Sequence, residues 1–283
     1  MKIQEALIKA YNILKEQNIE TYMLDAQLLM CSVIKKDKLF ITMNKDFKIS
    51  KRERDEFFRL VNIRKRKMPV KYILGECEFM GINFKVSQGV LIPRPDTEIL
   101  VEETMKYVKE LGIKNICDVC CGSGAIGLSI AYYFEDVHVV LYDISTTAYK
   151  VTKKNIDNLK LVKSTKVEIS DLLEKAIVNG LEFDMIVSNP PYIRKDVIPT
   201  LMDDVKDYEP YTALCGGEDG LEFYRKITEQ SLKVLKKNGV LAYEIGYDQN
   251  EEVKNILKSN GFDDIKCFKD LGGNDRVVIG IKK

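Results

Sequence analysis

The sequence predicts an α/β protein with a doubly wound, mostly parallel sheet, preceded by a small helical domain. From residue 115 onward, short apolar runs alternate with helical segments, which is typical of parallel strands joined by helices. Residues 1 to about 70 carry apolar residues at helical spacing instead. The last two apolar runs, 262–268 and 276–281, are joined by a link too short for a parallel crossover. These two strands are therefore expected to be antiparallel.

Composition and charge exclude several classes of protein. The chain has 283 residues, of which 45% are hydrophobic and 31% are charged, and its formal net charge is +1. A near-neutral charge argues against a protein that binds bulk nucleic acid. No run approaches the roughly 18 apolar residues of a membrane span, and the N-terminus lacks the apolar core of a signal peptide. We therefore expect a cytoplasmic protein without membrane contact and without direct nucleic-acid binding. We also expect a monomer.

The first domain is expected to contain three helices within residues 1–70. An apolar stripe begins at Ile3, a second helix carries Leu28 and Leu29, and Ser50 followed by Glu53 forms a capping box that opens a third. Its buried face is predicted to be Phe57, Leu60 and Val61. Residues 64–67 are all basic, which suits the last turn of a helix better than a partner-binding patch.

A β-hairpin around Gly81 is predicted to link the two domains, over residues 71–95. The second domain, 96–283, then begins with a helix near Thr97. Its strands are expected at 116–119, 137–142, 166–170, 183–188 and 240–246, followed by the antiparallel pair. A long helix over 221–237 should end at Asn238-Gly239.

A glycine-containing loop after the first of these strands predicts a nucleotide-like cofactor. Asp118 precedes Gly122 and Gly124, and Asp143 ends the next strand, where an acid can accept hydrogen bonds from ribose hydroxyls. Gly127 completes a superficial dinucleotide fingerprint. However, Asp118 would repel a pyrophosphate, whereas it suits the ammonium group of S-adenosylmethionine. We therefore favour S-adenosylmethionine over NAD.

The segment Asn189-Pro190-Pro191-Tyr192 follows the strand 183–188. In open α/β sheets, ligands bind at the carboxyl ends of strands. The Asn189 side-chain carbonyl and the Pro190 main-chain carbonyl can each accept a hydrogen bond, and the Tyr192 ring offers a flat wall. This set suits a planar –NH2 group, such as an amide or a nucleobase amine. The alternative is a proline-rich turn without a ligand.

Three of the seven cysteines, Cys117, Cys120 and Cys121, form a tight cluster. Zinc requires four ligands, and no second Cys/His pair stands nearby; the single histidine is His138. We therefore expect buried thiols and no metal.

These motifs resemble those of the HemK/PrmC-type protein-(glutamine-N5) methyltransferases, which modify the Gly-Gly-Gln loop of peptide chain release factors. The resemblance covers nearly the whole chain. It rests on the cofactor loop with Asp143, on the Asn189–Tyr192 segment and on these further motifs: Pro69-x-x-Tyr72-Ile73-x-Gly75, Phe79-x-Gly81, Leu91-Ile92-Pro93-Arg94-Pro95-Asp96-Thr97-Glu98, Glu209-Pro210-x-x-Ala213-Leu214, Gly216-Gly217-x-Asp219-Gly220-Leu221, Glu244-Ile245-Gly246 and Asp275-Arg276-Val277-Val278. Asn-Pro-Pro-Tyr alone is shared with nucleic-acid amino-methyltransferases.

The resemblance implies a class I S-adenosylmethionine-dependent methyltransferase fold, with a seven-stranded sheet and a helical substrate-docking domain. The residues implied to contact the cofactor are Asp118, Cys120, Cys121, Gly122, Ser123, Gly124, Asp143, Asp171, Leu172 and Asn189. Asn189, Pro190, Pro191 and Tyr192 would bind the substrate glutamine, with Asn189, Pro190 and Tyr192 catalytic. Arg94 or Glu98 would lie near the substrate, or form a salt bridge in the linker instead.

One position departs from the family pattern, because Cys120 stands where the first glycine of the loop is usual. A cysteine there is strained if the position requires a positive φ. Two other functions fit the same motifs: an RNA or DNA amino-methyltransferase that receives a flipped base at Asn189, and a non-catalytic binding protein of this fold.

Overall fold

A computed structural model describes residues 1–283, and the chain divides into two compact units. Unit 1 comprises Met1–Glu76 and Met202–Tyr208, and unit 2 comprises Cys77–Leu201 and Glu209–Lys283. The division falls at Glu76, beyond the expected end of the helical domain at residue 70. Residues 202–208, expected in the second domain, are counted with unit 1.

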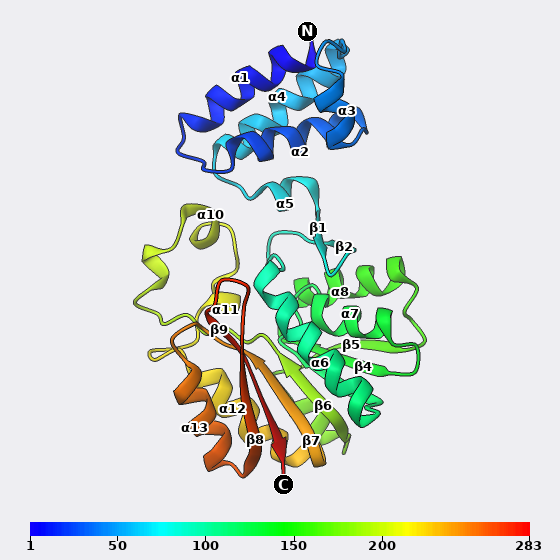
Figure 1. The fold of residues 1–283 in the computed structure, drawn as a ribbon, viewed down its shortest axis with the longest axis vertical. Helices are drawn as coiled ribbons and strands as arrows, with labels where there is room; N and C mark the ends of the chain where they lie inside the picture. Colours follow the sequence, from blue (N-terminus) through cyan, green and yellow to red (C-terminus); the bar gives the residue numbers. More distant parts are fainter. The chain divides into compact units, whose positions relative to one another are not determined.

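Unit 1 is helical (Figure 1). Its helices are α1 (Ile3–Lys15), α2 (Tyr22–Ile34), α3 (Lys38–Met43), α4 (Lys51–Lys65), α5 (Val70–Leu74) and the short α10 (Asp203–Lys206). The capping box is present, since Glu53 N–H donates to the Ser50 hydroxyl at 3.2 Å and Ser50 N–H donates to the Glu53 carboxylate at 2.7 Å. The three residues predicted to form the buried face of α4 lie in the core. Three short helices, α3, α5 and α10, were not predicted.

The basic run at the end of α4 does more than complement the helix dipole. Arg64 is buried, and its Nε lies 2.7 Å from Oδ2 of the equally buried Asp25 of α2. The next basic residue with a partner, Lys67, pairs with Asp203. These ion pairs fasten α4 to α2 and to the segment 202–208.

Unit 2 is built on the seven-stranded sheet that the sequence predicts, with the order β5-β4-β3-β6-β7-β9-β8. The strands are β3 (Asn115–Val119), β4 (His138–Asp143), β5 (Thr165–Ile169), β6 (Phe183–Ser188), β7 (Leu235–Glu244), β8 (Phe262–Lys269) and β9 (Asp275–Lys282). The first five are parallel, and β9 runs antiparallel to both β7 and β8. The antiparallel end of the sheet is therefore confirmed.

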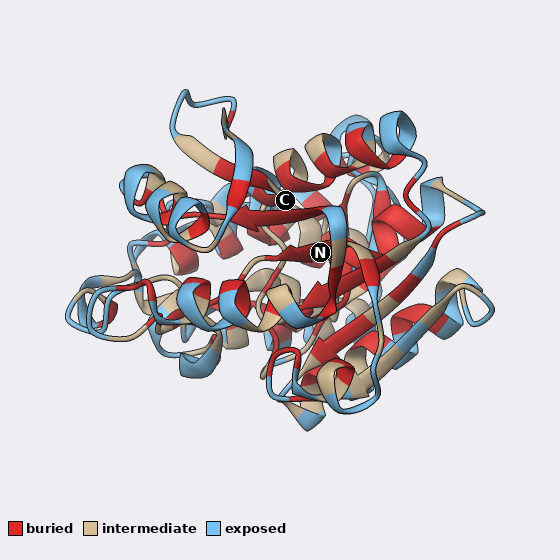
Figure 2. Cartoon of the chain, turned by 90° about the horizontal axis from the view of Figure 1, so that it is seen from below, coloured by how far each residue is buried: buried red, intermediate tan, exposed pale blue.

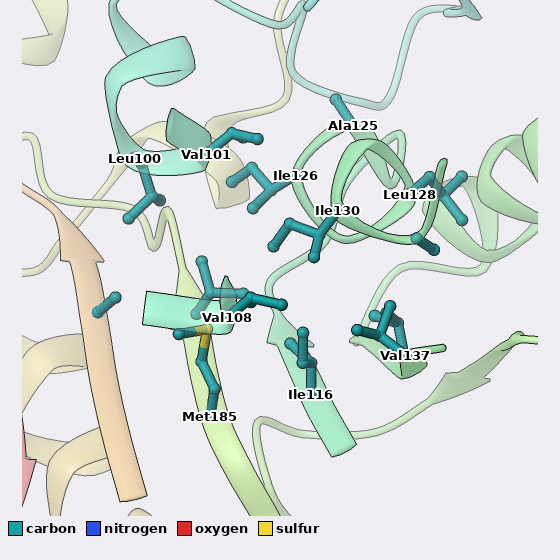
Figure 3. Close-up of a cluster of buried hydrophobic side chains, with 14 of the residues drawn as sticks. Leu100, Val101, Val108, Ile116, Ala125, Ile126, Leu128, Ile130, Val137 and Met185 are labelled. Atoms are coloured by element: carbon teal, nitrogen blue, oxygen red, sulfur yellow. The ribbon is translucent and has the colours of Figure 1, made fainter. Parts of the chain in front are cut away.

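Helices cover both faces of this sheet. The helices of unit 2 are η1 (Pro95–Thr97), α6 (Glu98–Leu111), α7 (Ala125–Tyr133), α8 (Thr146–Leu159), α9 (Glu174–Val178), η2 (Ile198–Thr200), α11 (Tyr211–Leu214), α12 (Glu222–Val234) and α13 (Asn250–Ser259). One apolar cluster joins α6, α7 and α8 to the sheet, and the other joins α9, α12 and α13 to it. In the first cluster, Leu100, Val108 and Ile130 lie over Ile116 and Met185 (Figure 3).

The predicted hairpin is present as β1 (Glu76–Phe79) and β2 (Ile82–Lys85), a two-stranded sheet of its own. Phe79, Ile82 and Phe84 are buried in the first cluster of unit 2. The main-chain N–H of Lys85 donates to Oδ1 of Asn155 in α8 at 2.7 Å. The hairpin is thus part of the core of unit 2.

One predicted boundary is wrong: helix α12 ends at Val234, and the chain enters β7 directly at Leu235. Leu235 is 2% exposed and is paired with Phe183 of β6. Burial and pairing in the sheet outweigh continuation of the helix. Asn238, at φ 61°, lies within β7, near a register shift opposite Phe183 and Met185. The inner strands of the sheet form the buried layer in Figure 2, whereas the edge strands β5 and β8 are mostly intermediate or exposed. None of the helices is both long and apolar enough to span a bilayer.

Candidate active site

The site lies where the strand order reverses. β4 and β5 lie on one side of β3, whereas β6 lies on its other side, with Val119 paired to Ser188. The loops that follow β3 and β6 therefore diverge at one edge of the sheet, which is the usual ligand-binding crevice of doubly wound folds. Cys120 and Asn189 are the first residues of these two loops.

A cavity of about 330 Å³ opens at this edge, within the usual range for a small-molecule site. Residues from the loops after β3, β4, β5 and β6 line it, together with residues from the chain before η1 and from α11. The lining includes Gly89, Val90, Leu91, Cys120, Gly122, Asp143, Ile144, Ser145, Ala148, Asp171, Leu172, Asn189, Pro191, Tyr211, Thr212, Ala213, Cys215 and Phe223.

The structure brings together seven of the residues predicted for the site: Cys120, Gly122, Asp143, Asp171, Leu172, Asn189 and Pro191 all line the cavity. Asp118, Cys121, Ser123, Gly124, Pro190 and Tyr192 are not among the lining residues. They shape the loops behind it, and any direct contact between these residues and a ligand stays a prediction.

The Asp143 carboxylate holds the loop after β3 against the end of β4. Its Oδ2 accepts from Gly122 N–H at 2.8 Å, and its Oδ1 accepts from Ser145 N–H at 2.8 Å. Burial raises the pKa of Asp143, and these main-chain donors oppose that effect. Each carboxylate oxygen has further lone pairs, so the group can also receive the hydroxyls of a ligand in the cavity.

Cys120 has φ 61°, in the left-handed region that favours glycine. The loop therefore does require a positive φ at the position where the family usually has glycine. A non-glycine residue there costs on the order of 1 kcal/mol. Burial raises the pKa of the Cys120 thiol well above its ordinary value, so the group is a neutral part of the cavity wall.

Asp118 is fully buried beneath the same loop. Its Oδ2 accepts from Gly127 N–H in the first turn of α7 at 2.8 Å, and its Oδ1 has no hydrogen-bond partner. Burial raises the pKa of this carboxyl to about 7. A partnerless buried carboxylate oxygen behind the loop fits a nearby positive group, which is the role the sequence predicts.

The Asn189–Tyr192 loop is held from behind by polar contacts. Nδ2 of Asn189 donates to the Thr97 hydroxyl at 3.4 Å, which leaves Oδ1 as the atom available to accept from a ligand. The Tyr192 hydroxyl donates to Oε1 of Glu244 at 3.3 Å, and Pro190 is buried. The Tyr192 ring packs against the second apolar cluster and is not part of the cavity wall.

A glycine-rich segment fastens this loop from the other side. Gly216 N–H donates to the Ile193 carbonyl at 2.8 Å, and Gln249 Nε2 donates to the Tyr192 carbonyl at 3.0 Å. A Cβ atom on Gly220 would lie 2.5 Å from the Tyr192 carbonyl oxygen, and one on Gly216 would lie 2.7 Å from the Tyr192 Cα. Contacts this close exclude any side chain, which explains the glycines at positions 216 and 220 of this segment.

Several lining residues were missed by reasoning from the sequence. Leu91 and residues 211–213 belong to motifs that carried the resemblance, but nothing in their spacing showed that they reach the cavity. Ile144 follows Asp143 and is 63% exposed. The available signal in the sequence was its position directly after a strand-ending acid, at the carboxyl edge of the sheet.

Arg94 and Glu98 do not line the cavity. Arg94 Nη2 lies 2.6 Å from Oε2 of the buried Glu209, so the salt-bridge alternative holds for Arg94. Glu98 accepts from Met80 N–H at 2.6 Å and ties α6 to the hairpin. Cys117 and Cys121 are buried free thiols.

The cavity fits S-adenosylmethionine by its chemistry. Asp143 offers acceptors for ribose hydroxyls, Ile144, Leu172 and Phe223 offer apolar walls for a planar base, and Asp118 places a partnerless carboxylate oxygen behind the loop. Asn189 lies in the same wall, so a group held by its Oδ1 shares the cavity with the cofactor.

Comparison with known proteins decides the family. The release factor glutamine methyltransferase of Clostridium acetobutylicum is 55% identical over 282 residues, spanning 100% of this chain and 99% of the relative. The protein of the same name from Clostridium botulinum is 54% identical, over 98% of each chain. The chain belongs to the release factor glutamine methyltransferase family.

Two family models match separate parts of the chain. Residues 5–75 match the PrmC N-terminal domain, and residues 95–203 match the methyltransferase small domain. Among solved structures, the T. thermophilus 16S rRNA N2 G1207 methyltransferase, in complex with AdoMet and guanosine, shares the fold. It is 17% identical with a TM-score of 0.51, over 74% of this chain and 50% of that one. The class I methyltransferase fold expected from the resemblance is confirmed.

Proposed function

We propose that the protein transfers a methyl group from S-adenosylmethionine to the side-chain amide nitrogen of the glutamine in the Gly-Gly-Gln motif of peptide chain release factors. The observation that carries this proposal is that Asn189 lines the same cavity as Asp143 and donates from Nδ2 to Thr97, which leaves its Oδ1 to accept from a substrate amide. Identity of 55% across the whole chain to a release factor glutamine methyltransferase supports the substrate.

The residues present can do what amide methylation requires. An amide nitrogen is a poor nucleophile because its lone pair is delocalised into the carbonyl. S-adenosylmethionine, when bound, supplies an electrophilic methyl group on a sulfonium. Asn189 Oδ1 and the Pro190 carbonyl would accept the two amide N–H bonds and orient the nitrogen lone pair toward the cofactor. This is catalysis by positioning and electrostatic preorganisation.

No strong base is needed before attack. The methylated nitrogen is cationic and acidic, and its proton can then leave to solvent. The only histidine, His138, begins β4, at the opposite end of that strand from Asp143. This arrangement agrees with a mechanism that uses hydrogen-bond acceptors in place of an imidazole.

Unit 1 is proposed to dock the body of the release factor, because one glutamine side chain cannot distinguish release factors from other proteins. Seven large apolar side chains of this small unit are exposed: Ile8, Met23, Leu24, Leu39, Met43, Phe47 and Met202. Leu39 and Met43 are four residues apart on α3 and therefore share one face of that helix. A cytoplasmic location and a monomeric state remain predictions.

The experiment that tests this function supplies three candidate acceptors together. The protein is incubated with S-adenosylmethionine labelled on its methyl group, a release factor and total RNA. We expect the label in the release factor, on the glutamine of its Gly-Gly-Gln motif by mass spectrometry. Label in RNA alone would favour the nucleic-acid amino-methyltransferase instead, and no label in either would favour the non-catalytic alternative.

A further inference from the structure

The buried side-chain amide of Gln249 holds the Asn189–Tyr192 loop from outside the cavity. Gln249 is 7% exposed and is not a lining residue. Its Nε2 donates to the Tyr192 carbonyl at 3.0 Å and to the Gly220 carbonyl at 3.2 Å. Its Oε1 accepts from Gly246 N–H at 2.9 Å. The nitrogen and the oxygen of this amide are therefore both bound to the main chain.

The three main-chain partners fix which end of the amide is which. A carbonyl can only accept a hydrogen bond, and a main-chain N–H can only donate one. A half-turn of the amide would set its oxygen against the carbonyls of Tyr192 and Gly220, and its –NH2 against Gly246 N–H. The neighbours of Gln249 thus allow a single orientation, in which its –NH2 faces the loop.

The main chain of Gln249 is anchored as firmly as its side chain. Gln249 directly precedes α13, and its carbonyl accepts from Val253 N–H at 3.0 Å. Its own N–H donates to the Gly246 carbonyl at 3.0 Å. A group carried at the start of a helix is placed more precisely than one carried on a loop.

Two glycines make room for this amide. A Cβ atom on Gly220 would lie 2.7 Å from Gln249 Nε2, and one on Gly246 would lie 2.9 Å from Gln249 Oε1. Gly220, Gly246 and Tyr192 belong to three separate motifs that carry the family resemblance. Gln249 belongs to none of them, yet all three motifs meet at its side chain.

The path from Gln249 to the group that receives the substrate is short and stiff. Tyr192 is the third residue after Asn189, and only Pro190 and Pro191 stand between them. Each proline ring locks φ, and a residue before proline is itself restricted. The main chain from Asn189 to Tyr192 therefore has few ways to bend. A displacement of the Tyr192 carbonyl is passed on to Asn189.

We propose that Gln249 is a positioning residue for the substrate amide: it fixes the Tyr192 carbonyl and, through the two prolines, the place of the Asn189 side chain in the cavity. Its action is indirect, because Gln249 does not line the cavity. This role rests on the proposed function for its substrate, but the order of the loop can be measured without turnover.

The kinetic test alters the Gln249 amide in two ways. Gln249→Met keeps the length of the side chain without the amide, and Gln249→Glu keeps an acceptor for Gly246 but sets a second oxygen against the two carbonyls. We expect both variants to lower kcat for release factor methylation by roughly ten- to hundred-fold, the cost of a small misplacement of a reacting group. Affinity for S-adenosylmethionine, measured by calorimetry, should change by less than about twofold, because Gln249 is not in the cavity wall.

Two controls alter buried polar side chains elsewhere in unit 2. Thr104→Val removes a hydroxyl that donates only to main-chain carbonyls of α6, and it should leave kcat and cofactor affinity near wild type. Asn155→Leu removes a side-chain amide that is 1% exposed and donates to the Ser123 carbonyl of the cofactor loop at 2.9 Å. This variant should show the opposite pattern, with cofactor affinity lowered more than kcat.

Gly246→Ala displaces the same amide without removing it, which keeps the test decisive if Gln249→Met does not fold. The added Cβ, 2.9 Å from Gln249 Oε1, forces the side chain away from its place. The expected pattern is that of Gln249→Met. In every variant kcat is expressed per cofactor site counted by calorimetry, so that unfolded molecules do not lower it.

Hydrogen exchange, followed by mass spectrometry, needs no turnover and reports the order of the loop directly. Ile193 N–H donates to the Leu214 carbonyl, and Lys195 N–H donates to the Gly217 carbonyl, each at 3.0 Å. In Gln249→Met these two amides should exchange roughly tenfold faster or more, because the loss of the grip on Tyr192 favours local opening. In Asn155→Leu and Thr104→Val their exchange should not change.

The two measurements separate failure of this role from failure of the proposed function. If wild type labels no release factor, the proposed function fails, while the exchange rates still decide whether Gln249 holds the loop. Unchanged exchange at Ile193 and Lys195 in folded Gln249→Met would overturn the role of Gln249. Faster exchange with an unchanged kcat, or a loss of cofactor affinity as large as the loss of kcat, would overturn it too.

Discussion

Gly122 N–H and Asp143 Oδ2 lie 2.8 Å apart, and this one hydrogen bond joins the glycine-containing loop after β3 to the acid that ends β4. The bond gives Asp143 two tasks, since the carboxylate holds the loop in place and is also exposed to the cavity that the loop forms. The predicted ribose acceptor and the predicted cofactor loop are therefore one structural element.

Asp143→Ala should weaken S-adenosylmethionine binding by roughly ten- to hundred-fold, because a charged acceptor contributes ~1.5–3 kcal/mol per hydrogen bond. Calorimetric titration measures the affinity. Asp136→Ala is the control, because the Asp136 side chain is 87% exposed and pairs only with the exposed Lys114 on the surface. Equal affinities in the two variants would remove Asp143 from the cofactor site.

The left-handed backbone at Cys120 predicts that a glycine variant at this position is more stable than a valine variant. Cys120→Gly should unfold at the same urea concentration as wild type or higher, whereas Cys120→Val should lose about 1–2 kcal/mol, since a β-branched residue is strained at positive φ. The same two substitutions at Cys267, within strand β8, serve as the matched control. At Cys267 the valine variant should be more stable than the glycine variant, because glycine weakens a strand. Greater stability of Cys120→Val than of Cys120→Gly would contradict the strain at Cys120.

Gly220→Ala should lower kcat by about 10²-fold through displacement of the Asn189–Tyr192 loop, since small misplacements of a reacting group carry costs of this size. The added Cβ would lie 2.5 Å from the Tyr192 carbonyl oxygen. Gly273→Ala is the matched control, because φ is 82° at Gly273 and 76° at Gly220, yet a Cβ on Gly273 meets nothing within 4 Å. Similar kcat values for both alanine variants would mean that the close approach does not position the loop.

Docking by unit 1 predicts a difference between a whole release factor and a short Gly-Gly-Gln peptide. The double variant Leu39→Ser/Met43→Ser should raise KM for the whole protein by roughly tenfold, the effect of losing about 1.4 kcal/mol of apolar contact. KM for the peptide should not change. Val178 and Leu271, exposed apolar residues of unit 2, serve as controls in a second double serine variant. If the peptide KM rose as much as the protein KM, the docking role of α3 would be wrong.

Much of the fold could be predicted from the sequence because its strands are short apolar runs with turn residues between them. The antiparallel end of the sheet followed from the short link before β9, and the capping box at Ser50 fixed the start of α4. The end of α12 could not be predicted in this way. It depends on the pairing of Leu235 with Phe183, a contact distant in sequence.

The site residues that could be predicted from position alone are those that end a strand or directly follow one. Asp143 and Asn189 were found because parallel strands place their carboxyl ends at one edge. Thr97 and Glu244 were quoted only within family motifs, because their roles depend on side-chain contacts between elements far apart in the chain. The positive φ of Cys120 likewise required coordinates.

The most direct test of the account is the turnover of Asn189→Ala with a release factor, measured beside its affinity for S-adenosylmethionine. The account predicts a kcat lower by ~10²-fold or more, the usual cost of removing one preorganised group at the reacting atoms, with cofactor affinity nearly unchanged. Methylation by Asn189→Ala at the wild-type rate would contradict the claim that Asn189 Oδ1 receives the substrate amide.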